Sequence, residues 1–189
     1  MADKIKALRL KEPFGLDNIQ VTEMEDPGQP GPGEIRVKVK ASSLNFHDYG
    51  VAAGFIPTED GRIPMSDGAG VVEAVGEGVE EFAVGDNVVS TFFPYWQSGP
   101  APVGDFHNTP GDGIDGYARE VVVRPTQFFT HQPKGYSHAE SATLTTAGLT
   151  AWRALVVDGG IKPGNTVLVL GSGGVSVFAC SLKSLVRII

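Results

Sequence analysis

A glycine-rich turn at residues 171–176 is the segment of this chain whose chemistry can be read most directly. It follows the apolar run Thr166–Leu170 and has the sequence Gly-Ser-Gly-Gly-Val-Ser. Gly171 allows a sharp turn after a strand, and Gly173 allows the backbone to approach a pyrophosphate held at the start of a helix. Ser176 replaces the third glycine of the G-x-G-x-x-G pattern and is still small. The pattern predicts a nucleotide-binding turn, and the alternative is a turn with a purely structural role. The residues expected to bind the nucleotide are Gly171, Ser172, Gly173, Gly174, Val175 and Ser176.

Short strands separated by turn residues are expected from residue 4 to residue 123. Apolar and polar residues alternate in residues 4–10, 19–21 and 34–43, which is typical of half-buried strands. In the first of these segments the alternation slips by one residue after Ala7, which suggests a β-bulge. Glycines near residues 68–78 suggest further bulges and tight corners. The whole segment is therefore expected to form a small barrel or sandwich.

A long loop and then a helical region are expected after these strands. Residues 94–116 are rich in Pro and Gly without a regular pattern, which predicts a surface loop. Its residues Trp96, Phe106 and His107 are expected either to anchor the loop or to cover a ligand. Residues 137–140 read Ser-His-Ala-Glu and match a capping box, so a helix should begin near Ala139. Helical pattern continues to Val156 with an interruption near Gly148. The apolar run at residues 166–170 predicts a strand covered on both faces, followed by a further helix over 174–184.

Composition excludes several classes of protein. The 189 residues carry a net charge of −7 and a pI near 5.0, without a Lys/Arg cluster, so no nucleic-acid partner is expected. The single cysteine, Cys180, excludes an internal disulfide framework and is expected to be a small buried hydrophobe. No stretch approaches the ~18 apolar residues that cross a bilayer. We therefore expect a cytoplasmic protein with no membrane partner.

Several segments of the chain, in this order and spacing, resemble the medium-chain dehydrogenase/reductase superfamily. They are Gly68–Val79, Val84–Val88, Gly116–Glu120, Thr146–Trp152 and Val167–Val175. The resemblance covers Lys4 to Ala179 and implies a mixed fold. Residues 1–133 are expected to form a GroES-like catalytic domain with a partly open β-barrel. Residues 134–189 are expected to form connecting helices and the first β-α unit of a Rossmann domain, with NAD or NADP bound between the two domains.

The resemblance also identifies the positions that bind zinc in one branch of the superfamily. Asn45 stands where zinc enzymes have a cysteine, Ser66 lies at the second ligand position, and Thr146 stands at the remaining cysteine position. His47 and Asp67 could offer a nitrogen and an oxygen, but zinc needs three or four converging ligands. We therefore expect no zinc and no other metal. The chain is placed in the zinc-free branch of alcohol dehydrogenase-like and quinone oxidoreductase-like proteins.

The zinc-free branch implies hydride transfer from a nicotinamide to a small carbonyl, enone or quinone substrate. Without a metal, charge on the substrate oxygen needs hydrogen-bond donors, for which the catalytic candidates are Asn45, Tyr49 and Thr146. Each has a structural alternative: a helix cap, a core position and a bond to a helix carbonyl, respectively. Residues expected to bind the cofactor, besides the glycine turn, are Asn45, Phe46, Thr146 and Thr150.

The choice between NAD and NADP cannot be predicted from these residues. The residue that decides it lies ~20 positions beyond the first glycine, which is past Ile189. The resemblance thus stops within the Rossmann domain, and we expect the chain to be truncated there and weak or inactive by itself. The alternative is a non-catalytic GroES-like binding or interaction module. A homodimer is possible under either interpretation.

Overall fold

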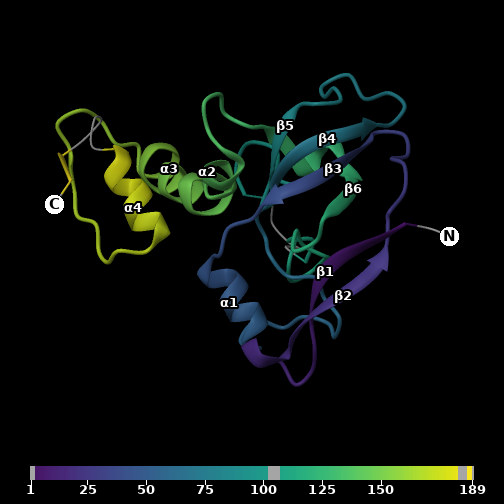
Figure 1. Ribbon diagram of the computed structural model, residues 1–189. Coiled ribbons are helices and arrows are strands. Elements are labelled where there is room, and N and C mark those ends of the chain that lie inside the picture. Colours follow the sequence, from purple (N-terminus) through teal and green to yellow (C-terminus); the bar gives the residue numbers. More distant parts are fainter. Residues whose placement is uncertain (1–2, 102–106, 183–186, 189) are drawn as a thin grey trace.

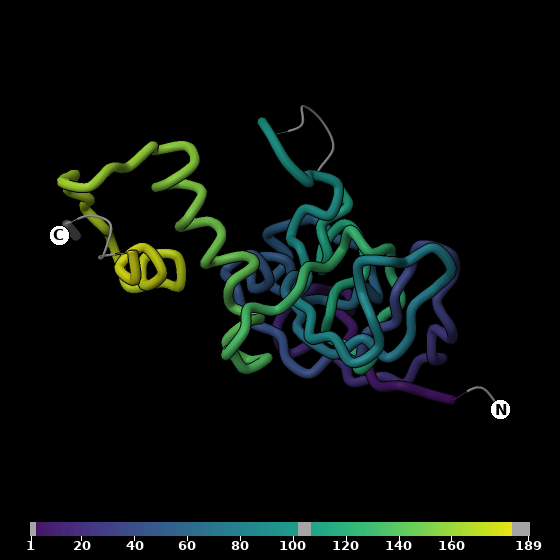
Figure 2. The backbone as a smooth tube through the Cα atoms, turned by 90° about the horizontal axis from the view of Figure 1, so that it is seen from above, coloured from purple at the N-terminus to yellow at the C-terminus, as the bar shows by residue number. Residues whose placement is uncertain are grey.

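The protein is described by a computed structural model in which residues 3–101, 107–182 and 187–188 are placed. Two antiparallel sheets and the short helix α1 (Phe46–Ala52) form the N-terminal part (Figure 1). Residues 138–182, which we call the helical arm, lie together on one side of the sheets. Seen from above, the chain beyond α2 leaves the sheet part and turns back on itself (Figure 2).

The larger sheet has five antiparallel strands in the order β6-β3-β4-β5-β7. Their bounds are β3 Glu34–Ala41, β4 Ala69–Val75, β5 Asn87–Ser90, β6 Val121–Pro125 and β7 Phe129–His131, the last preceded by the turn η2 Thr126–Phe128. One face of this sheet carries the main core, because alternate residues such as Ile35, Val37, Val72 and Val122 are almost fully buried. The expected half-buried alternation is confirmed for β3.

The pairing of β3 with β4 is irregular, as the glycines of this region predict. The register shifts between Arg36 and Val37 and again between Val39 and Ala41. A Cβ at Gly70 would lie 2.2 Å from the carbonyl oxygen of Lys38, so only glycine allows the two backbones to approach in this way. The sheets remain open and do not close into a barrel, which agrees with the expected partly open GroES-like fold.

The smaller sheet is a hairpin of β1 (Lys4–Leu10) and β2 (Ile19–Glu25), joined through the turn η1 (Leu16–Asn18). Its register is continuous from one end to the other, so the predicted bulge after Ala7 is wrong. Leu8 lines a surface hollow and is only half-buried. The apolar alternation of β1 therefore changes after Ala7 without the extra residue that a β-bulge would insert. Leu10 packs on Val51 and Ala52 of α1 and ties the hairpin to that helix.

The helical arm begins where the capping box predicts. Ser137 accepts a hydrogen bond from the backbone of Glu140, and the Glu140 carboxylate accepts one from the backbone of Ser137 at 2.8 Å. The successive segments are α2 His138–Ala142, the π-helix η3 Leu144–Gly148, α3 Leu149–Trp152 and the π-helix η4 Arg153–Asp158. Ala142 packs against Ala69 and Val89, which fixes the start of the arm on the larger sheet.

The strand before the glycine turn differs from its prediction. β8 comprises only Thr166–Val167 and pairs in parallel with β9 (Arg187–Ile188). Leu168 and Leu170 are 67% and 79% exposed, so the strand covered on both faces is not found. A parallel strand is buried when other elements cover both faces of its sheet, and β8 lies in a sheet of only two short strands among the placed residues, with its apolar neighbours Leu168 and Leu170 exposed.

The helix α4 (Gly174–Ser181) follows the glycine turn as predicted. Cys180 on this helix is exposed, so its expected burial is wrong. The side chain falls on the solvent side of α4, whereas Ala179 beside it is buried.

The predicted loop at residues 94–116 is placed in part. Trp96 lies under the guanidinium group of Arg153 at 4.2 Å and beside the ring of Phe93. This contact joins the loop to the helical arm and supports the anchoring interpretation. Phe106 lies outside the placed residues. Within the part of the chain that is described, no helix combines the length and apolar character needed to cross a bilayer.

Candidate functional site

The centre of the site is the carboxylate of Asp67, which accepts four side-chain hydrogen bonds. Oδ2 accepts from the Ser43 hydroxyl at 2.7 Å and from the Asn45 amide at 2.9 Å. Oδ1 accepts from the hydroxyls of Thr145 at 2.9 Å and Thr146 at 2.6 Å. Asp67 is fully buried. These four donors together supply the polar partners that a buried carboxylate requires.

Three separate segments bring these side chains together. Ser43 and Asn45 follow β3, Asp67 precedes β4, and Thr145 and Thr146 lie in the π-helix η3. The Ser42 hydroxyl also donates to the backbone oxygen of Asp67 at 2.7 Å. The site therefore forms where the larger sheet meets the helical arm, and it joins residues that are 79 positions apart.

Burial and hydrogen bonding act in opposite directions on Asp67. Removal from water disfavours the charged form and is the larger effect, so the pKa of the carboxyl is raised above its ordinary value. The bonds from Ser43, Thr146, Asn45 and Thr145 favour the charged form and oppose this rise. An ionised carboxylate is acceptor-only, and only that form can accept all four bonds at once.

A second carboxylate holds the start of α1 against the same segment. Asp48 accepts from the backbone of Asn45 at 2.9 Å through one oxygen and from the backbone of Ser66 at 2.8 Å through the other. Asn45 stands at the N-cap position of α1, and its side chain reaches Asp67. Asn45 therefore stands at the N-cap of α1 and also donates a hydrogen bond from its side chain to Asp67.

The backbone after Asp67 is tightly enclosed. The backbone N–H of Gly68 donates to the Ser90 hydroxyl at 2.8 Å, and the Ser90 N–H donates to the Gly68 oxygen at 2.7 Å. A Cβ at Gly68 would lie 2.6 Å from Cγ of Tyr117, whose ring is buried. Gly68 is thus required by close packing, and this packing fixes the position of Asp67.

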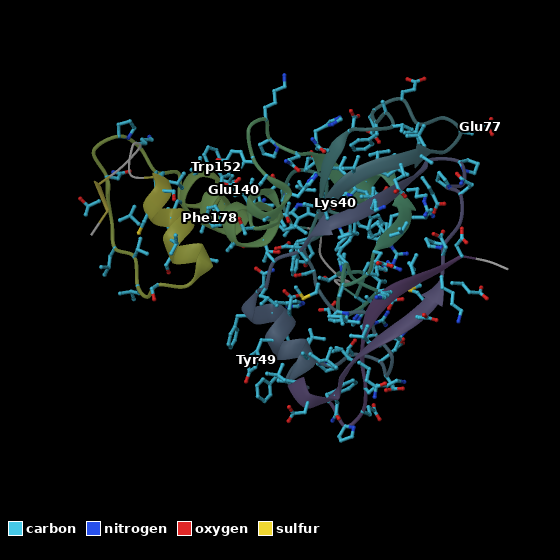
Figure 3. The ribbon with its side chains drawn as sticks, in the orientation of Figure 1. Lys40, Tyr49, Glu77, Glu140, Trp152 and Phe178 are labelled. Carbon is cyan, nitrogen blue, oxygen red and sulfur yellow. The ribbon has the colours of Figure 1, made fainter. Side chains whose placement is uncertain are left out.

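The other predicted site residues of the N-terminal part lie at the surface. Phe46 is 85% exposed and Tyr49 is 43% exposed, and their rings are 5.8 Å apart on α1. Figure 3 shows Tyr49 on the side of α1 that faces away from the sheets. Thr150 on α3 is also exposed. The structure brings Asn45 and Thr146 together on Asp67, but Phe46, Tyr49 and Thr150 are not part of this network.

The glycine turn has the backbone form that its sequence predicts. Gly171 has φ +83°, a left-handed conformation that favours glycine. Gly173 caps α4 with an extended backbone, and a Cβ there would meet no atom within 4 Å. The Ser176 hydroxyl donates to the Leu170 oxygen at 2.9 Å, and a Cβ at Gly174 would lie 3.3 Å from that of Ala147. Residues 171–175 of the turn, including Ser172 and Val175, are exposed, and Ser176 is half-buried.

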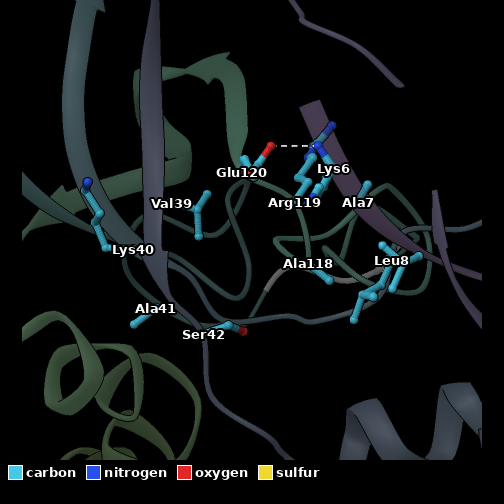
Figure 4. A pocket seen from close by; sticks show the side chains of 11 residues that line it. Lys6, Ala7, Leu8, Val39, Lys40, Ala41, Ser42, Ala118, Arg119 and Glu120 are labelled. Atoms are coloured by element: carbon cyan, nitrogen blue, oxygen red, sulfur yellow. Dashed lines mark hydrogen bonds between the residues drawn. The ribbon is translucent and has the colours of Figure 1, made fainter. Parts of the chain in front are cut away.

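A surface hollow of about 310 Å³ lies between β1 and β3 (Figure 4). Lys6, Val39, Lys40 and Arg119 are among its lining residues, together with Ser42. Ser42 links the hollow to Asp67 through its hydroxyl, which donates to the Asp67 backbone oxygen. The hollow therefore adjoins the Asp67 site without containing its side chains.

The residues at the family zinc positions do not fit a zinc ion. Asn45, Ser66 and Thr146 offer neither a thiolate nor an imidazole, and the one carboxylate between them already accepts four bonds. Within the placed residues there is no group of three or more His, Cys, Asp or Glu side chains that could hold a metal. His47 instead faces Asp112, with Nε2 3.0 Å from Oδ2.

Sequence reasoning missed the central role of Asp67. It considered this residue only as a possible metal ligand, and it did not consider Ser43 or Thr145. The available signal was the position of Asp67 directly before the Gly-Ala-Gly of β4, beside a position where zinc enzymes bind metal. Its four partners could not be identified, because they lie in two segments remote from it along the chain.

Comparisons with known proteins identify the family of the chain. The family described as "Alcohol dehydrogenase GroES-like domain" matches residues 31–134. A zinc-type alcohol dehydrogenase-like protein of Schizosaccharomyces pombe is 43% identical over 169 residues, which cover 87% of this chain and 49% of the relative. The chain therefore spans about half the length of that relative.

Solved structures of similar proteins cover nearly the whole chain. An NAD-dependent alcohol dehydrogenase matches with a TM-score of 0.84 and 33% identity, over 97% of this chain and 56% of that one. A quinone oxidoreductase of Pseudomonas syringae matches with a TM-score of 0.76 and 29% identity, over 97% of this chain and 51% of that one. In each case the similarity extends through the helical arm and the glycine turn.

Proposed function

Because the chain belongs to the medium-chain dehydrogenase/reductase superfamily through its alcohol dehydrogenase GroES-like domain, we propose that it carries the substrate-side part of an NAD(P)-dependent oxidoreductase. The reaction is hydride transfer to a small carbonyl, enone or quinone without zinc. The observation that supports the zinc-free assignment is the Asp67 network, because it engages Asn45 and Thr146, which the family resemblance aligns with two zinc-ligand positions. The division into residues 1–133 and 134–189 is part of this proposal.

The nicotinamide cofactor would be held at the glycine turn. Gly171 and Gly173 leave the backbone N–H groups at the start of α4 open to a pyrophosphate, and the α4 dipole favours negative charge there. When bound, the cofactor supplies the hydride. NAD is supported by the similarity to a structural relative that is an NAD-dependent alcohol dehydrogenase, whereas the residue that would choose between NAD and NADP is not among those described.

The protein would stabilise charge on the substrate oxygen by hydrogen bonds. Asn45 has an amide held in place by Asp67, and Tyr49 is an exposed tyrosine on the helix that Asn45 caps. Positioning of the substrate next to the hydride donor would supply much of the rate. A polar, metal-free site of this kind suits a substrate whose reacting carbon is already electron-poor.

Titration of NADH and NADPH against the purified chain, followed by tryptophan fluorescence, tests the proposal. Gly173→Val should weaken binding at least about tenfold, because its side chain would enter the space left for the pyrophosphate while the folded state has room for it. The control is Gly15→Ala, at a position with extended backbone and no atom within 4 Å, which should bind as the wild type does.

The two functional alternatives give different outcomes. Oxidation of NAD(P)H with a quinone or enone would establish the oxidoreductase directly. A stable dimer with no nucleotide affinity would favour a binding or interaction module instead. Near-stoichiometric zinc after metal analysis would contradict the zinc-free assignment.

A further inference from the structure

The hydroxyl of Thr146 has one proton, and the structure commits that proton to Asp67. The distance from Thr146 Oγ1 to Asp67 Oδ1 is 2.6 Å, shorter than any of the other three bonds to this carboxylate. A hydroxyl that donates here can offer only its lone pairs to another group. Thr146 was a candidate donor to the substrate oxygen, and this geometry is incompatible with that role.

The same reasoning applies to each donor around Asp67. The hydroxyls of Ser43 and Thr145 are also used, so neither has a proton left. Asn45 differs because its amide has two hydrogens. One is bound by Asp67 at 2.9 Å, and the other faces the Ser66 hydroxyl at the longer distance of 3.4 Å. The amide of Asn45 is therefore the one member of the network with a weakly used proton.

We propose that Asp67 is the positioning residue of this site: it orients the Thr146 hydroxyl as a hydrogen-bond acceptor and leaves Asn45 as the donor to a bound ligand. The role of Asn45 toward a substrate rests on the proposed function, whereas the directions of the hydrogen bonds around Asp67 do not. Asp67 itself touches no substrate in this assignment, because both of its oxygens are enclosed by the four donors.

The ligand groups that fit follow from this polarity. Beside Thr146 the site accepts an O–H or N–H group, and beside Asn45 it accepts a carbonyl or developing alkoxide oxygen. A neutral Asp67 would have to donate one bond itself, to the hydroxyl of Ser43, Thr145 or Thr146, and donation to Thr146 would reverse the direction of that hydroxyl. The direction of the Thr146 hydroxyl is therefore the property to measure.

The test is nuclear magnetic resonance of the full chain, with labelled threonine hydroxyls and aspartate carboxyls. In the wild type we expect a slowly exchanging hydroxyl proton on Thr146. In Asp67→Asn that proton should exchange about tenfold faster, because a bond to a charged acceptor is lost. Thr58, whose hydroxyl donates to the backbone oxygen of Asp112 at 2.7 Å, is the internal control and should be unchanged.

A second pair of variants keeps the proposal testable if Asp67→Asn fails to fold. Thr146→Val should move the pH titration of the Asp67 carboxyl upward, because one bond that favours its charged form is removed. Thr146→Ser keeps the hydroxyl and should restore the wild-type titration, which a purely steric role for Thr146 would not produce.

The outcomes separate this inference from the proposed function. A rapidly exchanging Thr146 hydroxyl in the wild type, or equal titration of Asp67 in Thr146→Val and the wild type, would overturn the assignment of Asp67. These measurements need neither nucleotide nor turnover. Loss of nucleotide binding in the titration experiment would instead refute the proposed function and leave the polarity of the network intact.

Discussion

Replacing Gly68 by alanine should destabilise the protein by disturbing the packing that fixes Asp67. The added Cβ would lie 2.6, 2.8 and 2.9 Å from three atoms of Tyr117, whereas ordinary van der Waals contact is 3.4–4 Å. Tyr117 is 3% exposed, and its ring packs edge-on against Phe129 with centroids 6.0 Å apart. The ring is therefore buried, and it can move away from Gly68 only by displacing its neighbours.

The cost can be estimated from this clash. Overpacking of a filled core costs typically 1–3 kcal/mol, and a ring held on all sides belongs at the upper end, about 3 kcal/mol. Lower entropy of the unfolded chain offsets less than about 1 kcal/mol of this loss. With a urea dependence near 2 kcal/mol per M, the denaturation midpoint of Gly68→Ala should fall by roughly 1–1.5 M.

Urea denaturation followed by tryptophan fluorescence measures this effect. In a Tyr117→Ala background the same glycine substitution should cost less than about 1 kcal/mol, because Cγ and Cδ1 of Tyr117, the two atoms nearest to the new methyl group, are then absent. Gly15→Ala is the control and should stay within about 0.5 kcal/mol of the wild type. Equal midpoints for Gly68→Ala and the wild type, or additive effects in the double variant, would refute the reasoning.

Three further predictions concern ion pairs and a helix cap. Arg36 Nη2 donates to Asp26 at 2.7 Å, and the side-chain hydrogen bonding of Arg36 lowers the pKa of Asp26 to about 2. The ion pair therefore stabilises the folded state above about pH 4, and this contribution is lost as the pH falls toward 2. In urea titrations at several pH values, Asp26→Asn should remove about 1–2 kcal/mol of stability that is present at neutral pH and absent near pH 2. The ion pair with Asp112 raises the pKa of His47. His47→Gln should therefore be less stable than the wild type below about pH 6.5, and the difference in stability should vanish above the raised pKa. A difference in thermal midpoint that does not depend on pH would contradict this. Ser137→Ala removes the N-cap of α2 and should lower the free energy of unfolding, measured by urea denaturation, by about 1 kcal/mol. Ser137→Asp can still cap the helix and should keep most of the wild-type stability.

Elements with a local signal could be predicted from the sequence. The strand at residues 34–41 follows from its alternation, and α2 follows from the capping box at Ser137. The glycines around Gly70 predicted irregular pairing, which the structure confirms in the register shifts of β3 against β4. In each case the residues that determine the structure lie within a few positions of one another.

Features that depend on remote neighbours could not be predicted. The apolar residues Leu168 and Leu170 predict a buried strand, but burial depends on what lies on either side of it, and both are exposed. The reverse holds for Asp67, whose type predicts a surface residue and whose four donors make burial possible. Nothing adjacent to Asp67 in the chain indicates that two threonines 78 and 79 residues away will bind it.

The π-helix η3, which follows α2 in the arm, has a consequence for how this protein opens. Thr145 and Thr146 satisfy one oxygen of Asp67 from the arm, while Ser43 and Asn45 satisfy the other from the sheet side. Small separations of the arm would leave a charge without partners in a region closed to water, and such a state is strongly unfavourable. Partial hinge motion at this junction is thus penalised, and the arm should undock in a single cooperative step.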